Sequence, residues 1–234
     1  MLIGQAAAIL YAKHGARVIV CDINEPGAAE TLSMINGNGG EATFIKADVS
    51  SASDCHALVK QTVEKYGKLD IAFNNAGIGG EINTITEMSI EGWLKVINVN
   101  LNSVFYCMKY QIPEMLKQGK GAIVNMSSIL GQVAFSHSAA YVAAKHGIVG
   151  LTRNAAVEYA ANGIRVNAVG PAFINTPLLS VLDDQTKQAL VKMHPIGRLG
   201  EAKEVAELVL WLSSDSASFV TGSYYAIDGG YLAV

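Results

Sequence analysis

Several features that mark particular classes of protein are scarce in this sequence of 234 residues. The three cysteines, Cys21, Cys55 and Cys107, are an odd number without metal-like spacing. We therefore predict no metal site and no disulfide framework, and small buried thiols suit a reducing, cytoplasmic location. No apolar run reaches the length of a membrane span, and the apolar start Met1–Leu10 lacks the basic flank of a secretion signal.

Positive charge is also scarce. The 17 lysines and arginines are outnumbered by 20 aspartates and glutamates, which gives a formal net charge of -3. This balance gives no electrostatic reason to expect nucleic acid or an anionic membrane as a partner. No proline- or serine-rich linker and no internal repeat divides the chain, and its length suits one sizeable core. We predict a single domain over residues 1–234.

Short β-branched runs alternate with longer runs of helical periodicity. The predicted strands are Arg17–Cys21, Ala42–Lys46, Leu69–Phe73, Ala122–Met126, Arg165–Val169 and Tyr224–Ile227. Predicted helices run from Ser51 to a stop at Gly67, from Ala139 to Ala161, and from Glu201 to Leu212. Strands that are apolar along their length and interleaved with helices predict a doubly wound, Rossmann-like α/β fold with a parallel sheet. Such folds bind ligands beyond the carboxyl ends of their strands.

The beginning of the chain departs from this pattern. A doubly wound nucleotide-binding fold usually opens with a strand, a glycine-rich turn and then a helix that receives the pyrophosphate. Here a helical face begins at Ile3, and Gly15 is its natural stop. Only Gly4 remains of a glycine-rich turn, so we predict that the first strand is absent. The cluster Asn36–Gly40 follows a helix and precedes a strand, which indicates a connecting turn.

One pair of residues indicates proton chemistry. Tyr141 and Lys145 are four residues apart in a predicted helix, so they share a face. A tyrosine is a poor base at neutral pH, and lowering its pKa to about 7 requires roughly 4 kcal/mol of differential stabilisation. The Lys145 ammonium and a positively charged cofactor ring together would supply that stabilisation. Alone, the pair is a weak signal, because helices carry such spacings by chance.

A serine follows the predicted strand Ala122–Met126. Ser128 lies at the carboxyl end of that strand, where ligands bind in this fold, and its hydroxyl would polarise a carbonyl or hold an alkoxide. Ser127 is the rival for this role. For either serine the plainer interpretation is a hydrogen bond that closes the strand end.

Several motifs stand in a fixed order along the whole chain. They are Asn74-Asn75-Ala76-Gly77, Val99-Asn100-Leu101, Val124-Asn125-Met126-Ser127-Ser128, Tyr141-Val142-Ala143-Ala144-Lys145, Pro171-Ala172-Phe173-Ile174-Asn175-Thr176-Pro177, and Val220-Thr221-Gly222 with Asp228-Gly229-Gly230. In these motifs the chain resembles the single-domain branch of the short-chain dehydrogenase/reductase family. The resemblance implies an NAD(H)-dependent enzyme that interconverts a secondary alcohol and a ketone. It also implies a homotetramer, assembled through the long helices and the segment Tyr224–Val234.

The resemblance implies a role for individual residues. Tyr141 matches the general acid/base, Lys145 the residue that binds the nicotinamide ribose and lowers the tyrosine pKa, and Ser128 the residue that orients the reacting oxygen. Asn100 matches the asparagine that bends its helix and helps to hold a water beside the lysine. The expected cofactor-binding positions are Gly4, Asp22, Asp48, Val49, Asn74, Ala76, Gly77, Tyr141, Lys145, Ile174 and Thr176, and the expected substrate pocket is bordered by Ile129, Phe135, His137, Phe173, Leu178 and Met193.

One acidic residue bears on the choice of cofactor. Asp22 follows the strand Arg17–Cys21, where a carboxylate accepts the adenosine ribose hydroxyls and repels the extra phosphate of NADP. The alternative is an aspartate that caps the next helix. We favour the ribose role, and therefore NAD over NADP, with Asp48 and Val49 at the adenine edge.

The sequence also departs from the family. Leu2 stands where the family usually has glycine, and Ala172 replaces the glycine after Pro171. The absent strand would leave a slot of roughly 10 Å, two strand spacings, in the sheet. We favour a gene whose start lies upstream of Met1; the alternative is a protein that has closed its sheet or pairs with another chain. The rival function is a cofactor-impaired binding or assembly module without catalysis.

Overall fold

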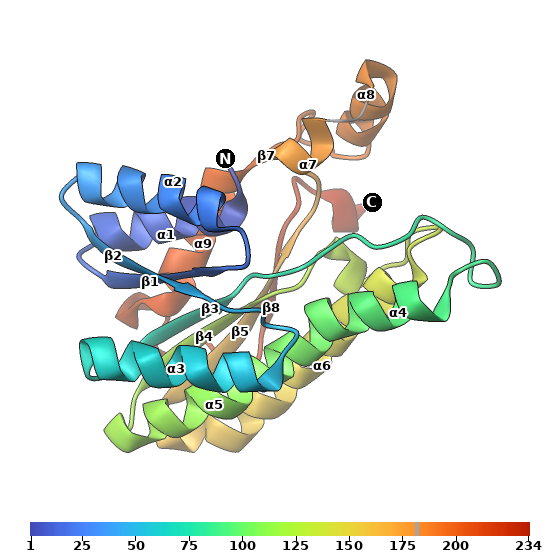
Figure 1. The fold of residues 1–234 in the computed structure, drawn as a ribbon. Coiled ribbons are helices and arrows are strands. Elements are labelled where there is room, and N and C mark those ends of the chain that lie inside the picture. The colour runs from blue at the N-terminus through green and yellow to red at the C-terminus, as the bar shows by residue number, and fades with distance from the viewer. Residues whose placement is uncertain (181–182) are drawn as a thin grey trace.

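Helices cover both faces of a parallel sheet in the computed structural model, which describes residues 1–180 and 183–234 (Figure 1). One face carries α1 (Ile3–Lys13), α2 (Glu25–Gly37) and α9 (Ala202–Ser213), and the other carries α3 (Ala52–Tyr66), α5 (Ser103–Gln118) and α6 (Ala139–Tyr159). The layers confirm the predicted doubly wound α/β fold, because a parallel sheet needs helices on both faces.

The strands follow the predicted runs closely. A four-stranded parallel sheet has the order β3 (Ile71–Asn74), β4 (Gly121–Met126), β5 (Ile164–Pro171) and β8 (Tyr224–Ile227), and a separate parallel pair joins β1 (Arg17–Asp22) to β2 (Glu41–Lys46). The third strand begins at Ile71 and not at the predicted Leu69. The fifth extends to Pro171, which lies in register with Ile227 of β8.

Local chemistry sets the helix ends. The Ser51 side chain accepts a hydrogen bond from the Asp54 N–H at the start of α3, and Gly67 ends this helix with φ of 82°. Gly15 takes φ of 84° after α1, as its predicted role as a stop requires. The predicted helix to Ala161 is α-helical only to Tyr159 and then continues as a 3₁₀ turn over residues 160–162.

The core has two halves, because neighbouring residues of a strand face opposite sides of the sheet. Val124 and Met126 of β4 pack with α1 and α9, whereas Ile123 packs with the α5 and α6 side. Every residue of β4 is buried. The strand that leads to Ser128 is thus enclosed on both faces.

The two sheets do not join. In the part of the chain that the structure describes, β1 pairs only with β2, and β3 pairs only with β4. Among the described residues no strand lies between β1 and β3, and these two strands do not pair with each other. A mainly apolar cavity of about 420 Å³ lies at this place, bounded by α1, β3 and α9 through Tyr11, Ile71 and Trp211.

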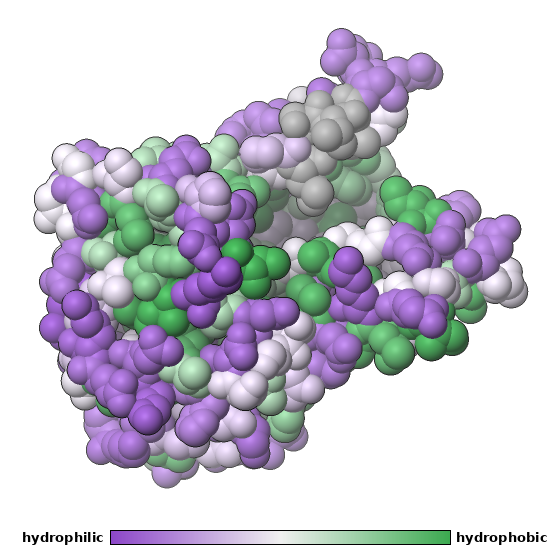
Figure 2. Space-filling view, viewed as in Figure 1, coloured by the Kyte–Doolittle hydropathy of each residue, from purple (hydrophilic) through white to green (hydrophobic). Residues whose placement is uncertain are grey.

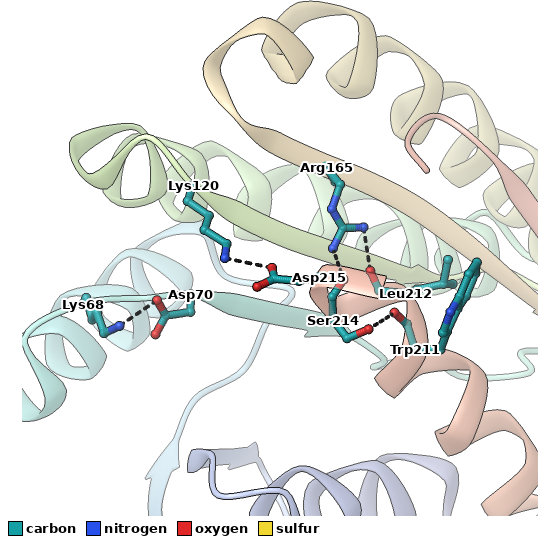
Figure 3. A network of polar contacts seen from close by, with 8 residues as sticks. All are labelled: Lys68, Asp70, Lys120, Arg165, Trp211, Leu212, Ser214 and Asp215. Atoms are coloured by element: carbon teal, nitrogen blue, oxygen red, sulfur yellow. Dashed lines mark hydrogen bonds and ion pairs between the residues drawn. The ribbon is translucent and has the colours of Figure 1, made fainter. Parts of the chain in front are cut away.

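A network of polar contacts fastens the amino ends of the larger sheet to the end of α9 (Figure 3). The Arg165 guanidinium donates to the carbonyls of Leu212 at 2.7 Å and Ser214 at 2.9 Å, and Lys120 pairs with Asp215 at 2.8 Å. Arg165 thereby satisfies carbonyls at the helix C-terminus, where a cation is also favoured by the helix dipole. This network lies at the amino ends of the strands, opposite the carboxyl ends where ligands bind in this fold.

Two segments project from the sheet and its covering helices. The chain after β3 runs out along an arm to α4 (Ile90–Ile97) (Figure 1). The helices α7 (Pro177–Ser180) and α8 (Asp184–Lys192) project from the body near β7 (Gly200–Glu201), which pairs with β6 (Ile174–Asn175). Among residues 1–180 and 183–234, no helix is long and apolar enough to cross a bilayer. The same residues hold no group of three or more histidine, cysteine or acidic side chains suited to a metal ion.

Candidate active site

Two adjacent serines at the end of β4 point to different neighbours. The Ser127 hydroxyl donates to the backbone carbonyl of Lys145 at 3.0 Å, so it fastens the strand end to α6. The Ser128 hydroxyl accepts from the Leu130 N–H at 3.2 Å, donates to the Pro171 carbonyl at 3.5 Å, and lies near enough to Tyr141 to affect the pKa of its phenol. The geometry favours Ser128 over Ser127 as the serine that meets a substrate.

Tyr141 and Lys145 lie one turn apart on α6, as their spacing predicts. The Lys145 ammonium nitrogen is 5.3 Å from the centre of the Tyr141 ring and donates to the carbonyl of Met126 at 2.8 Å. Only 2% of Lys145 is exposed. Burying an ammonium without a carboxylate partner is unfavourable, which makes Lys145 a candidate functional residue.

Burial shifts the pKa of both residues. It lowers the pKa of Lys145 from 10.5 to about 7, because the buried ammonium loses its hydration. It raises the pKa of Tyr141 above its usual range, and the neighbouring Ser128 side chain opposes part of that rise. The direction for Tyr141 is opposite to the lowering that we expected from Lys145 and a cofactor together. Desolvation of the phenolate dominates in the protein alone, and a lysine with a pKa near 7 is only partly charged at neutral pH.

Asn100 lies where the helix that precedes α5 changes its winding. Residues 98–102 form a π-helical turn, as expected if this asparagine bends its helix. The side chain is fully buried, accepts from the Ile78 N–H and donates to the Ile78 carbonyl, both at 2.8 Å. An added methyl at Gly77 would lie 3.6 Å from the Lys145 ammonium nitrogen. The loop after β3, the π-helical turn and α6 therefore meet at Lys145.

Asn74 has a different surrounding from the one expected of a cofactor-lining residue. Its amide nitrogen donates to Asn125 at 2.9 Å, and its amide oxygen accepts from Gln111 at 2.9 Å. Asn125 in turn donates to Thr152 at 3.0 Å. Both polar atoms of the Asn74 side chain are therefore hydrogen-bonded within the protein. Only the backbone of Asn74 could line a cofactor site. Ala76 is exposed in the loop that follows.

The beginning of α1 lies beside the end of β3. An added methyl at Gly4 would come within 2.7 Å of the Asn75 amide nitrogen, so this position requires glycine or a shift of the Asn75 side chain. Leu2 is the N-cap residue and provides no side-chain hydrogen bond to the helix. The amide groups of the first turn remain available to an anion. Asn75 was not among the predicted site residues, although it stands next to Asn74 in the same motif.

The predicted adenosine-binding residues lie at the carboxyl ends of β1 and β2: Asp22 is the last residue of β1, and Asp48 and Val49 follow β2. Asp22 is exposed, and one of its carboxylate oxygens accepts from the Asn24 N–H at 2.9 Å. Asn24 is itself the N-cap of α2, so the capping role considered for Asp22 belongs to Asn24. Asp48 accepts from the Ser50 N–H and hydroxyl in a turn before α3, and the carbonyl of Val49 accepts from the Cys55 thiol at 3.3 Å.

The chain after β5 forms a second wall of the site. Ala172 donates its N–H to the carbonyl of Ile227 at 3.3 Å, and Ile174 is buried in the core beside α9. The Ile174 side chain therefore faces the interior, and its backbone is the part that a ligand would meet. The Thr176 carbonyl accepts from the Leu179 N–H at 2.9 Å at the start of α7.

The predicted pocket residues are only partly brought together. The rings of Phe135 and Phe173 are 6.1 Å apart in an edge contact. Ile129 is buried, and Met193 is partly exposed. His137 is an exposed residue with φ of 63°, and the side chain of Leu178 lies outside the described part of the chain. Figure 2 shows a hollow between the layer of α1 and α2 and the arm that carries α4, with apolar residues around it.

Two aromatic neighbours of Phe173 were not anticipated. The ring of His194 lies 5.8 Å from the Phe173 ring, and that of Tyr231 lies 6.2 Å from it. They come from the end of α8 and from the C-terminal 3₁₀ turn, far from Phe173 in sequence. No local pattern indicates such a contact.

Comparisons with known proteins agree with this arrangement. A family model described as enoyl-(acyl carrier protein) reductase matches residues 2–232. The cyclohexanol dehydrogenase of Acinetobacter sp. strain SE19 is 50% identical over 98% of this chain and 90% of that protein. The cis-4-hydroxycyclohexanecarboxylate dehydrogenase of Sinomonas cyclohexanicum is 42% identical over 99% and 93%. The crystal structure of levodione reductase superimposes with a TM-score of 0.96 at 36% identity, over 99% of this chain and 94% of that one.

Proposed function

The chain belongs to the short-chain dehydrogenase/reductase family, whose members are oxidoreductases that use nicotinamide cofactors, and on this premise we propose that it interconverts a secondary alcohol and a ketone with NAD(H). One observation carries the proposal. The buried Lys145 ammonium lies 5.3 Å from the Tyr141 ring at the carboxyl end of β4, with the Ser128 side chain beside that tyrosine. This arrangement supplies a proton donor and acceptor, a cation beside it and a hydroxyl that orients the substrate.

The proposed proton path runs through these residues. Ser128 donates a hydrogen bond to the substrate oxygen, and Tyr141 takes the proton when the alcohol is oxidised or gives it when the ketone is reduced. The raised pKa of Tyr141 makes its phenolate dependent on a nearby cation, so protonated Lys145 is required at that moment. Both polar atoms of the Asn100 side chain are hydrogen-bonded to the backbone of Ile78. The backbone carbonyl of Asn100 is therefore the group that would hold a water beside Lys145.

The residues present fit a nicotinamide cofactor. Gly77 presents backbone without a side chain next to Lys145, whose ammonium has further donors for ribose hydroxyls. Ile174 and Thr176 would meet the carboxamide and phosphates through their backbones, and the start of α1 at Gly4 would meet the pyrophosphate. Bound here, an oxidised nicotinamide would accept the hydride from the carbinol carbon.

We propose NAD over NADP on the basis of Asp22. Its carboxylate is exposed at the end of β1 and is not used as the α2 cap. An exposed carboxylate favours two ribose hydroxyls and disfavours a phosphate at the same place. Asp48 and Val49, beyond the neighbouring strand, would lie toward the adenine.

The proposed substrate is an uncharged alicyclic secondary alcohol. Two of the relatives are named for cyclohexane-ring alcohols. In this chain the rings of Phe135 and Phe173 are in contact, and their apolar surface would suit a hydrocarbon ring.

Steady-state kinetics with the purified chain test this function. We expect NADH formation with NAD⁺ and cyclohexanol, little with a primary alcohol of equal carbon number, and less with NADP⁺ than with NAD⁺. Turnover of the primary alcohol at an equal or higher rate would contradict the secondary-alcohol assignment.

A second function, a binding or assembly module without catalysis, is favoured by one observation. The edges of β1 and β3 that face away from their partners are unpaired in the described residues, so their backbone groups could pair with a strand of another chain. A calorimetric titration with NADH separates the two: submicromolar binding rejects the module, and absence of both binding and turnover supports it.

We also propose a homotetramer. Trp93, Leu94 and Phe105 expose apolar surface on α4 and α5, and Val157 does so on α6. Tyr231 instead packs on Phe173 of its own subunit, which leaves the long helices as the principal interface. Gel filtration with light scattering gives the oligomeric state directly, and a monomer at micromolar concentration would contradict this proposal.

A further inference from the structure

A buried histidine links the end of α8 to the loop that follows β5. His194 is 3% exposed, and its ring makes two backbone contacts. Nε2 accepts a hydrogen bond from the Phe173 N–H at 3.4 Å, which requires that Nε2 carry no proton. The neutral ring then has its proton on Nδ1, which donates to the Leu190 carbonyl at 2.7 Å.

These contacts hold Phe173 from several directions. Its carbonyl accepts from the Gly200 N–H at 3.0 Å, so the returning chain binds both backbone groups of this residue. Its ring meets His194 at 5.8 Å and Tyr231 at 6.2 Å. The next residue, Ile174, begins β6 and pairs with Gly200 of β7. The position of Phe173 therefore sets where the backbone of residues 174–176 begins.

We propose that His194 is a positioning residue that fixes the loop 172–176 against the cofactor. This inference rests on the proposed function, because residues 174 and 176 hold the nicotinamide end only if the chain binds NAD(H). A neutral histidine suits the role because it presents a donor on one edge of a rigid ring and an acceptor on the other. A purely apolar side chain would fill the same space and leave both backbone groups without these partners.

Three substitutions separate the two contacts. His194→Gln places an amide oxygen where Nε2 lies and keeps the Phe173 contact. His194→Asn keeps only the donor to Leu190, and His194→Phe keeps only the ring packing. The matched control is His14→Asn, because the exposed His14 ring makes the same contact to the carbonyl four residues earlier, Leu10, at 3.0 Å.

The first readout needs no cofactor. Amide exchange at Phe173 should be about tenfold faster in His194→Asn and His194→Phe, since the N–H loses its acceptor, and close to wild type in His194→Gln and His14→Asn. Nitrogen-15 spectra of the wild-type ring should show the Nδ1–H tautomer. Equal Phe173 exchange in all variants, or a proton on Nε2, would overturn the inference.

The second readout is NADH binding. The dissociation constant should rise about tenfold in His194→Asn and His194→Phe and be recovered in His194→Gln, whereas kcat at saturating NAD⁺ should change by less than about threefold. Unchanged affinity in His194→Phe, or a wild-type affinity too weak to measure, would overturn the positioning role. Loss of alcohol oxidation with the NADH pattern intact would instead reject the proposed reaction and leave His194 in its role.

Discussion

The two central strands of the four-stranded sheet, β4 and β5, are more completely enclosed than the two strands of the β1–β2 pair. All six residues of β4 are buried, and in β5 only Arg165 is not. In β1 no residue is fully buried, and in β2 only Ile45 is. The larger sheet carries Ser128, and α6 packs on it with Tyr141 and Lys145. The smaller sheet carries Asp22 and leads to Asp48.

This difference separates two tasks in the proposed enzyme. Proton transfer requires groups that are held rigidly and shielded from water, and the buried strands β4 and β5 provide that environment. Discrimination between NAD and NADP at the adenosine ribose requires an accessible carboxylate. The exposed strands β1 and β2 provide it through Asp22. Changes to one sheet should therefore affect turnover, whereas changes to the other should affect cofactor affinity.

The largest effect should follow from Tyr141→Phe, which tests the enclosed half. Removing the phenolic hydroxyl should lower kcat by roughly 10³-fold, within the range for loss of a general acid/base. NADH affinity should change little. Tyr110→Phe, on α5 and stacked on His56, is the control and should leave turnover unchanged. A Tyr141→Phe enzyme with more than about a tenth of wild-type kcat would reject the proton-transfer assignment.

Lys145→Met should reduce turnover by roughly 10²-fold and yet stabilise the protein at neutral pH. The pKa of Lys145 falls from 10.5 to about 7 on folding, which corresponds to roughly 4 to 5 kcal/mol against folding when the amine is protonated. Loss of the Met126 hydrogen bond offsets about 1 kcal/mol of the gain. The net increase in the free energy of unfolding should be about 3 kcal/mol at pH 7.

The stability difference between Lys145→Met and the wild type should depend on pH. Between about pH 7 and 10.5 the unfolded chain holds a proton on Lys145 that the folded chain does not, so wild-type stability rises with pH relative to the variant. Urea unfolding of both proteins at pH 7 and pH 9.5 should show the advantage of Lys145→Met shrinking. An advantage that stays constant or grows would contradict the lowered pKa of Lys145.

Hydrogen exchange compares the sheets directly. Amides in β4 and β5 should exchange at least about a hundredfold more slowly than those in β1 and β2, because enclosed strands open only with the global transition. The comparison uses Val124 and Val166 against Val18 and Thr43, with mass spectrometry of overlapping peptides. Equal protection in the two sheets would mean that they open as one unit, and the distinction between them would fail.

The smallest effect should come from Asp22→Asn, which tests the exposed half. Removing the charge should raise the kcat/KM ratio of NADP⁺ to NAD⁺ by about tenfold, from reduced repulsion of the phosphate. The control is Asp70→Asn, at the opposite edge of the molecule in an ion pair with Lys68. An unchanged cofactor preference would remove Asp22 from the ribose site.

The sequence was sufficient for features set by local chemistry. Tyr224–Ile227 was predicted with its observed bounds, and the ends of α3 at Ser51 and Gly67 follow from a serine cap and a left-handed glycine. The separate pairing of β1 and β2 followed from the incomplete glycine motif at Gly4. The pairing of Tyr141 with Lys145 followed from helix spacing, whereas the choice of Ser128 over Ser127 followed from the family resemblance.

Features that depend on distant parts of the chain were not predictable. The commitment of Asn74 to Gln111 and the ring contacts of His194 join residues far apart in sequence, and no periodicity encodes them. The two-residue strands β6 and β7 are too short to leave a pattern. The raised pKa of Tyr141 also required the structure, because only the packing shows that desolvation outweighs the neighbouring amine.

The amide network of Asn74, Gln111, Asn125 and Thr152 has a consequence for how the chain finds its fold. Asn74 lies directly opposite Asn125 in the pairing of β3 with β4. A slip by one residue would turn Asn125 to the other face and leave several buried amides without partners. Apolar neighbours such as Ile123 and Val124 would tolerate such a slip far better. The network therefore makes the observed register of β3 and β4 more stable than a register shifted by one residue.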